Sequence, residues 1–312
     1  MLSNAAPANE SGHGSPRLPR VAIVGAGLAG LVCGSRLREH GVPIEILEKG
    51  RGPGGRMATR RADAGGRKLD FDHGAQYFTV RDPAFAASLE PLRRQPSPLV
   101  ARWESPVVVL RGGRIGPTRG EVERNVFVPS MNALARRLAS ALPCRFETRV
   151  AHAARAFETW ELRSDLGSLL TEAEILVITA PADQAMAMLS NEAPLRAELS
   201  RVRSAPCWAV MVHFEESVGV DFGGAFVEDE ALAWVARNDS KPGRTRHEPA
   251  ESWVLHASPE WSEKHLEDPP VAVGSALLEA FARATGRSFP TAAWIQPHRW
   301  RFALPTAAAG TD

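Results

Sequence analysis

The residues that most constrain the fold are Gly25-Ala26-Gly27-Leu28-Ala29-Gly30, a G-x-G-x-x-G pattern between an apolar run and a helical pattern. Residues 21–24 predict a short buried strand, and the helix that the glycines open is expected to end at Gly41. The segment 42–50 predicts a second strand, in which apolar residues alternate with glutamates. A strand, a glycine turn, a helix and a second strand predict an α/β fold with a parallel sheet.

Each glycine of the pattern has a predicted role in binding a dinucleotide. Gly25 permits the tight turn, Gly27 lets the backbone approach a pyrophosphate, and Gly30 lets the helix pack on the strand. The phosphates would lie at the helix N-terminus. Glu48 ends the second strand, 18 residues after Gly30, where its carboxylate can accept from both ribose hydroxyls and disfavours a 2′-phosphate. The alternative is an ordinary strand–turn–helix with no ligand.

A second glycine cluster follows the second strand and contains Arg51, Gly52, Gly54, Gly55 and Arg56. A simple NAD domain usually continues straight into a helix, whereas this chain continues as a loop beside the first one. Arg56 would add a bidentate fork for phosphate. Two loops facing phosphates favour FAD over NAD.

These two motifs resemble those of the flavin-containing amine oxidase superfamily, in which a G-G-R follows the ribose carboxylate. The stretch DFDHGAQYFTVRDPAF, residues 70–85, resembles the narrower family of renalase and bacterial renalase-like flavoproteins. The similarity covers about residues 20 to 305. Further similar stretches are SMNALARRLA, TAPADQA, PCWAV, LAWVARNDSKPGR, WVLHASPEWSEKHLE and HRWRFALP.

The resemblance implies non-covalent FAD in a fold like that of p-hydroxybenzoate hydroxylase. Its FAD-binding Rossmann-type domain, a doubly wound parallel sheet, would be interleaved with a mostly antiparallel α+β substrate domain. The expected FAD domain is discontinuous and comprises residues 20–80, 125–190 and 297–312. The expected substrate domain comprises residues 81–124 and 191–296.

The resemblance also implies an activity. Renalase-like enzymes oxidise the 2- or 6-dihydro isomers of NAD(P) to NAD(P)+, passing a hydride to flavin, which oxygen then reoxidises to give hydrogen peroxide. The expected partners are therefore a small dinucleotide substrate and oxygen. A flavin-dependent amine oxidase is the main alternative; a non-catalytic remnant and an NAD-dependent dehydrogenase are further alternatives. Hydride transfer needs no acid–base pair here, since the hydride is already on carbon.

The residues 73–78 are expected to lie against the flavin ring and the substrate. Gly74 and Ala75 would be small because the ring packs on them, and His73 is expected to be a non-covalent neighbour. The alternative is a strand in the core. The expected cofactor contacts are Gly25, Gly27, Ala29, Gly30, Glu48, Lys49, Gly55, Arg56, Gln76, Tyr77 and Val150. The expected substrate contacts are Tyr77, Phe78, Thr79, Arg81 and Trp208, with no catalytic acid–base residue and no metal ligand.

Several of these assignments have equally simple structural alternatives. Val150 could bind adenine through its backbone, and Thr179-Ala180-Pro181 could contact the ligand or form only a strand-end turn. Trp208 and Trp234 could enclose a flat aromatic substrate. Lys241 and Arg244 have two interpretations, attraction of dinucleotide phosphates and a solvated basic loop, of which the solvated loop is preferred.

Periodicity predicts the remaining elements. A helix is expected over 130–142 with Ser130 as N-cap. Segment 51–80 has turn chemistry rather than periodicity, and five prolines from Pro91 to Pro117 predict loops and edge strands. The other expected elements are a surface strand at 157–164, a buried strand at 174–181, strands at 207–214, 231–237 and 252–258, and a helix at about 271–285.

Composition excludes several classes of protein. A net charge of +1 gives no electrostatic footprint for nucleic acid or an anionic membrane, and no apolar run approaches the ~20 residues of a membrane span. Residues 1–19 predict a disordered tail rather than a signal peptide. Three widely spaced cysteines suit a reducing compartment, so a cytoplasmic location is expected. Oligomeric state stays open.

The last residues depart from the resemblance, because the chain stops at PTAAAGTD. Members of the family continue with a last strand, a Gly-Asp pair at the cofactor and a final helix whose N-terminus faces the flavin. Gly310-Thr311-Asp312 does not replace them. A truncated member with weakened FAD retention and an unpaired sheet edge is therefore expected.

Overall fold

The structure is a computed structural model that describes residues 17–118, 122–189 and 193–307. Most of the predicted N-terminal tail and the final Gly310-Thr311-Asp312 lie outside the described residues. Next to the tail, the backbone N–H of Arg20 donates to Glu174, which also pairs with Arg17.

The first strands form the predicted parallel sheet, with the order β13-β1-β2-β9. These strands are β1 (Val21–Val24), β2 (Ile44–Leu47), β9 (Cys144–Arg145) and β13 (Ile175–Ile178). Helix α1 (Leu28–Glu39) connects β1 to β2, as predicted. The prediction that 174–181 is buried is wrong, because β13 lies at an edge of this sheet and Ile175 is 43% exposed.

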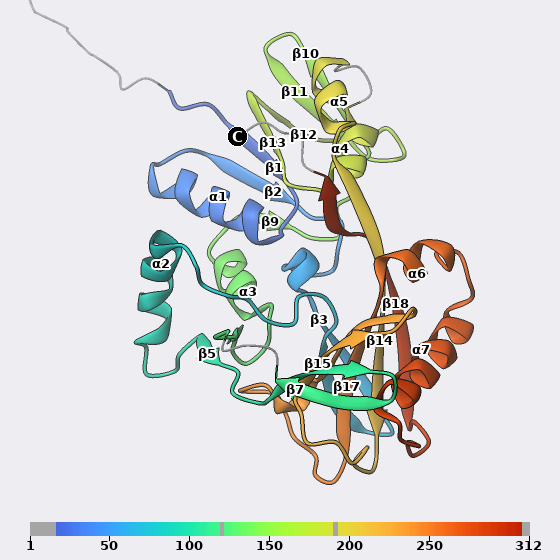
Figure 1. The fold of residues 1–312 in the computed structure, drawn as a ribbon. Helices are drawn as coiled ribbons and strands as arrows, with labels where there is room; N and C mark the ends of the chain where they lie inside the picture. The colour runs from blue at the N-terminus through green and yellow to red at the C-terminus, as the bar shows by residue number, and fades with distance from the viewer. Residues whose placement is uncertain (1–16, 119–121, 190–192, 308–312) are drawn as a thin grey trace, which may run out of the picture.

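A larger, mostly antiparallel sheet forms the other half of the molecule (Figure 1). Its order is β18-β14-β17-β16-β15-β6-β7, and only β15 and β6 pair in parallel. The strands are β6 (Val107–Arg111), β7 (Arg114–Thr118), β14 (Arg203–Phe214), β15 (Gly224–Glu228), β16 (Leu232–Arg237), β17 (Glu251–Ala257) and β18 (Trp294–Ala307). The two sheets together confirm the predicted fold class.

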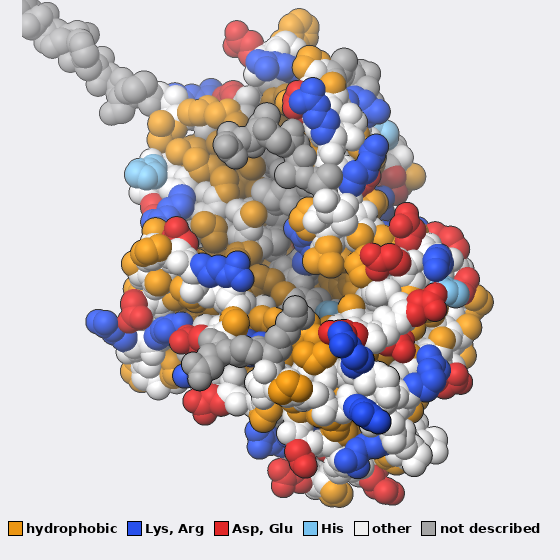
Figure 2. Space-filling model, in the orientation of Figure 1, with side chains coloured by type: hydrophobic (Ala, Val, Ile, Leu, Met, Phe, Trp, Pro, Cys, Tyr) orange, Lys and Arg blue, Asp and Glu red, His pale blue; other side chains and the backbone are white. Residues whose placement is uncertain are grey.

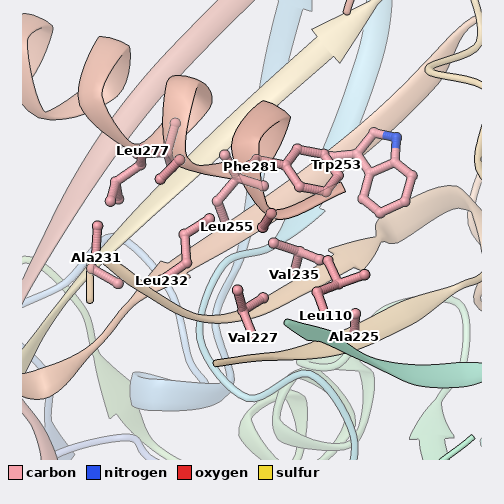
Figure 3. Close-up of a cluster of buried hydrophobic side chains, with 14 of the residues drawn as sticks. Leu110, Ala225, Val227, Ala231, Leu232, Val235, Trp253, Leu255, Leu277 and Phe281 are labelled. Carbon is pink, nitrogen blue, oxygen red and sulfur yellow. The ribbon is translucent and has the colours of Figure 1, made fainter. Parts of the chain in front are cut away.

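Two helices, α6 (Pro259–Lys264) and α7 (Pro270–Thr285), lie against this large sheet. Figure 3 shows Leu277 and Phe281 of α7 pointing at Trp253 and Leu255 of β17. All four are at most 2% exposed. Side chains alternate along a strand, so Val254, between Trp253 and Leu255, points to the opposite face of the sheet. There it packs against Leu69 and Phe71 of the segment 67–72.

Residues 297–312 are expected in the FAD domain. In the structure, β18 pairs with β14 from Trp294 to Ala307. The described part of this segment is therefore a strand of the antiparallel sheet.

The segment 51–80 contains more regular structure than its turn chemistry predicts. Strands β3 (Thr59–Ala64) and β4 (Arg67–Asp72) form a hairpin around Gly65-Gly66, where both glycines have positive φ. The sequence pattern is weak because β3 lies at the surface and packs few apolar residues.

The proline-rich region also differs from its prediction. Helix α2 (Pro83–Arg93) includes Pro91 in its last turn. The carboxylate of Asp82 accepts from the N–H of Phe85 and caps the helix, and Pro83 occupies its first turn. These start signals outweigh one proline near the end. Strand β7 is an edge strand of the large sheet, as the prolines predict, whereas β6 lies inside the sheet between β15 and β7.

The remaining elements are short. The N-cap of helix α3 (Ala133–Ser140) is Asn132, and not Ser130 as predicted. The Ser130 hydroxyl donates to the Asn132 side chain instead. The others are β5 (Val100–Arg102), β8 (Asn125–Phe127), β10 (His152–Ala156), β11 (Thr159–Arg163), β12 (Leu169–Ala173), α4 (Ala182–Met188), α5 (Ala193–Leu199) and the 3₁₀ turns Gly55–Met57 and Asn238–Ser240.

Among the described residues, no helix is long and apolar enough to cross a membrane. On the face seen in Figure 2, basic and acidic side chains are interspersed, in keeping with the net charge of +1.

Candidate functional site

The first glycine loop has the geometry that its sequence predicts. Gly25 has φ of +107°, which favours glycine, and a Cβ added to Gly30 would lie 2.1 Å from the carbonyl oxygen of Gly25. The predicted roles in turning the chain and packing the helix are thus confirmed. By contrast, no atom lies within 4 Å of a Cβ added to Gly27, so the backbone there faces open space.

The second glycine loop lies directly against the first. The N–H of Gly54 donates to the carbonyl of Ala26 over 2.9 Å, and Gly27 and Gly54 form an isolated parallel bridge. A Cβ added to Gly55 would lie 3.4 Å from the Cα of Gly27. The prediction that the two loops lie side by side is confirmed.

Glu48 joins both loops to the end of β2. One carboxylate oxygen accepts from the N–H of Ala26 over 2.8 Å, and the other accepts from the N–H of Gly50 over 2.6 Å. A carboxylate offers about four lone-pair sites, so acceptor capacity remains for hydroxyl groups of a ligand.

The residues fit a dinucleotide. Helix α1 begins at Gly27 with no side-chain cap and no acidic residue in its first turn. Its first N–H groups therefore favour an anion beside the open face of Gly27. The site would be occupied by a pyrophosphate next to α1 and by a ribose next to Glu48.

Other predicted cofactor residues lie around this loop pair. Ala29 is exposed in the first turn of α1. The Lys49 ammonium donates to Gln184 over 2.8 Å, and the exposed Arg56 guanidinium donates to the Ala303 carbonyl over 3.2 Å. Val150 is buried beside β1 and β2.

Thr179 lies at the end of β13 and has a structural role. Its hydroxyl lies 3.0 Å from the carbonyl of Val24 and 3.2 Å from that of Gly25. These contacts join β13 to the glycine loop, which is the strand-end alternative of the sequence interpretation.

The segment after β4 is held by the second glycine loop. The N–H of Ala75 donates to the carbonyl of Arg56 over 2.9 Å, and a Cβ added to Gly74 would lie 2.0 Å from that oxygen. A side chain at Gly74 is therefore excluded by the backbone of Arg56, which is a different reason from the predicted flavin contact. On the other side, the His73 carbonyl accepts from the Trp300 indole over 3.0 Å.

Asp72 is the centre of a buried polar network. Its carboxylate accepts from Thr59 over 2.7 Å, from the N–H of Met131 over 3.0 Å and from the Arg244 Nε over 3.0 Å, and it pairs with Lys241 at 3.5 Å. Burial raises the pKa of Asp72, but Lys241, Arg244 and the N–H of Met131 together outweigh burial, so this pKa lies below its ordinary value.

The preferred interpretation of Lys241 and Arg244 as a solvated basic loop is wrong. Lys241 is 1% exposed and Arg244 is 6% exposed, because both cations pair with Asp72 inside the protein. Burial lowers the pKa of Lys241 to about 8, although Asp72 acts in the opposite direction. No local pattern could reveal this, since Asp72 and Arg244 are 172 residues apart.

Gln76 belongs to the same network. Its amide nitrogen donates to the carbonyls of Asp72 and Gly74, and its amide oxygen accepts from Lys241 over 3.0 Å. All of the amide's polar groups thus have partners within the protein, which fixes the segment 72–76 in one conformation.

Three aromatic rings gather beside this segment. The ring of Tyr77 lies 5.5 Å from that of Trp234 and 6.3 Å from that of Trp103. Phe78 stacks on Phe127 at 4.7 Å. Trp103 was not predicted, because it lies on a proline-rich stretch with no recognisable motif.

The other residues that were predicted to contact the substrate do not lie together in the structure. Thr79 is half-buried and Arg81 is exposed. Trp208 and Trp234 cannot enclose one substrate, because they lie on opposite faces of the large sheet. Trp208 packs in the core under α6 and α7 and donates to the His265 carbonyl, whereas Trp234 contacts Tyr77 on the other face.

Three histidines meet on that second face. His73 and His298 lie 4.7 Å apart, and His256 Nε2 lies 3.2 Å from the carbonyl of His73. Burial lowers the pKa of His73 to about 3 and those of His256 and His298 to about 4. The imidazoles are therefore neutral at pH 7.

The three buried histidines should make the folded protein less stable at acid pH. In the unfolded chain they take up protons near pH 6.5, whereas in the folded chain they stay neutral to about pH 4. The free energy of unfolding should therefore fall as pH drops from 6.5 to 4. His256→Gln, whose amide nitrogen can still donate to His73, should show a smaller loss between pH 7 and pH 5 in urea titrations. His40→Gln at the surface is the control, and an equal loss in both variants would contradict this origin.

Comparisons with known proteins agree with this arrangement. Residues 23–90 match the family of NAD(P)-binding Rossmann-like domains. A stretch of 124 residues is 29% identical to a flavin-containing monooxygenase of Aspergillus flavus, covering 37% of this chain and 24% of that protein. The matched part is thus about a quarter of the curated relative's length.

Solved structures share the whole fold. A proposed protoporphyrinogen oxidase from Exiguobacterium sp. 255-15 superposes with a TM-score of 0.73 at 15% identity, over 93% of this chain and 88% of that chain. A redesigned putrescine oxidase gives 0.68 at 14% identity, over 90% and 84%. Reduced UDP-galactopyranose mutase gives 0.71 at 11% identity, over 93% and 83%.

Proposed function

We propose that the chain is an FAD-dependent oxidoreductase. In support, residues 23–90 match NAD(P)-binding Rossmann-like domains, and the chain shares its fold with a proposed protoporphyrinogen oxidase and a putrescine oxidase. The observation that carries this proposal is the open backbone face of Gly27, which lies between the uncapped start of α1 and the second glycine loop. When bound, FAD supplies an acceptor for a hydride and passes two electrons on to a second substrate such as oxygen.

The protein's own part is to bind and orient. The N–H groups at the start of α1 hold the pyrophosphate, and the free lone pairs of Glu48 accept from the ribose hydroxyls. The segment 74–77 provides a fixed surface for the flavin ring. The Gln76 amide and the Arg56 carbonyl hold its backbone, and Lys241 holds the Gln76 amide in turn. A fixed surface lowers the entropy lost on orienting a hydride donor against the ring.

Two substrate classes are candidates. The motif strings that resemble renalase-like proteins support the 2- and 6-dihydro isomers of NAD(P), and the fold shared with putrescine oxidase supports an amine. Mixing the FAD-loaded protein with each candidate under anaerobic conditions tests both, since a true substrate bleaches the flavin absorbance. Admission of air should then restore the colour and release hydrogen peroxide.

Gly27→Ala tests the cofactor assignment directly. Its Cβ meets no protein atom, so the urea midpoint should be unchanged, whereas a methyl group on the face that a phosphate approaches should weaken FAD binding by on the order of tenfold or more, a loss of about 1.4 kcal/mol. The readout is FAD retained after gel filtration.

Gly30→Ala is the matched comparison. Its Cβ would meet the Gly25 carbonyl at 2.1 Å and should destabilise the fold itself. Unchanged FAD content in Gly27→Ala would refute the proposed site, whatever happens to Gly30→Ala.

A further inference from the structure

Arg124 is a buried cation that has no counter-ion among the described residues. It is 8% exposed, and among the residues that the structure describes no carboxylate pairs with it. Its Nη1 donates to the Val122 carbonyl over 3.2 Å, but its Nε is sealed from solvent and has no hydrogen-bond partner. Burying an unpaired charge costs several kcal/mol, so a compensating group is expected.

Arg124 lies against the aromatic group of Tyr77, Trp103 and Trp234. Its guanidinium lies 5.4 Å from the centre of the Tyr77 ring, and Trp234 contacts the same ring at 5.5 Å. The indole Nε1 of Trp234 is a second buried polar atom without a partner. Two groups with unpaired nitrogens, from different residues, therefore both lie next to the ring of Tyr77.

Both unpaired groups are hydrogen-bond donors. An Arg Nε and a Trp Nε1 can only donate, so the missing partner must be an acceptor. Lys241, whose Nζ lies 5.7 Å from the centre of the Trp103 ring, adds a second cation to this side of the sheet. A protonated amine would satisfy neither donor and would be repelled by both cations.

We propose that Arg124 and Trp234 bind the anionic group of a substrate whose planar ring packs on Tyr77 and Trp103. The shared chemistry is a flat ring that carries a carboxylate or a phosphate, and cationic alkylamines are excluded. This inference rests on the proposed function, in which the same segment faces the flavin. Because neither nitrogen is open to solvent, binding must turn the ring of Tyr77 or Trp234 and should change tryptophan fluorescence.

Calorimetric titration of the purified protein with three probes of similar size tests the proposal. The probes are benzoate, phenyl phosphate and benzylamine, and tryptophan fluorescence is recorded in parallel. Wild-type protein should bind one or both anions and not benzylamine. The better of the two anions identifies the group, carboxylate or phosphate, that the site takes.

Arg124→Met separates a binding role from a structural one. A structural arginine should destabilise the fold when removed. If Arg124 serves to bind an anion, its replacement by Met should leave the urea midpoint unchanged or raise it, because an uncompensated buried charge is removed. Anion affinity should fall at least about tenfold, or about 1.4 kcal/mol, while Arg114→Gln, at the exposed edge strand β7, should bind as wild type.

Three results would overturn the proposal: no binding of either anion to wild type, equal or tighter binding of benzylamine, or unchanged anion affinity in Arg124→Met. The visible spectrum of the same sample decides the proposed function separately. A protein that holds no flavin but binds the anions through Arg124 would refute the oxidoreductase and leave the anion site standing.

Discussion

Asp72→Asn should lower the free energy of unfolding by about 3–5 kcal/mol, the usual cost of breaking a buried ion pair from one side. The amide keeps the shape of the side chain but removes the one carboxylate that, among the described residues, forms ion pairs with the buried Lys241 and Arg244. It also weakens the contacts to Thr59 of β3 and to the backbone N–H of Met131, two residues before α3. Urea unfolding at pH 7 measures the effect.

Asp70→Asn, on the same strand, is the matched control. Burial and the charge of Asp72 raise the pKa of Asp70, so neutralising Asp70 should cost little stability.

The contribution of Asp72 to the free energy of unfolding should also depend on pH. The pKa of Asp72 is depressed by its cations, so its contribution is present above the ordinary carboxyl pKa of ~3.9 and is lost as pH falls through the lower folded value. Equal stability of the two variants at pH 7 would contradict the role of Asp72.

Gly74→Ala should both destabilise the protein and reduce its FAD content. The added methyl group would lie 2.0 Å from the Arg56 carbonyl, a backbone atom that cannot turn away as a side chain can. Inserting one carbon into a packed site usually costs about 1–3 kcal/mol. Because Ala75 bonds to the same carbonyl, relief of the clash separates the second glycine loop from the segment 72–76.

The measurements are the urea midpoint and the FAD retained per chain. Gly52→Ala is the control for stability, since no atom lies within 4 Å of its added Cβ and its φ lies outside the left-handed region. If Gly74→Ala were as stable as Gly52→Ala, the close contact between Gly74 and the second glycine loop would not contribute to the stability of the protein.

The sequence alone determined the parallel sheet and both glycine loops. These features depend on near neighbours in the chain: Gly25 turns the backbone, Gly30 lets α1 approach β1, and Glu48 lies one strand further on. Steric requirements of this kind act within a few residues and leave a readable spacing. The apolar, β-type composition of residues 207–214, 231–237 and 252–258 also predicted the strands β14, β16 and β17.

Only the tertiary structure decided which charged residues of the candidate site are buried and on which face of the large sheet its tryptophans lie. Whether Lys241 and Arg244 are solvated or buried depends on Asp72, which comes from a distant strand. Trp208 and Trp234 look alike in the sequence, and only the register of the sheet places them on opposite faces. Arg124 stands out only because it is buried with no carboxylate partner in the part of the chain that the structure describes. Burial is set by packing between segments rather than by local sequence.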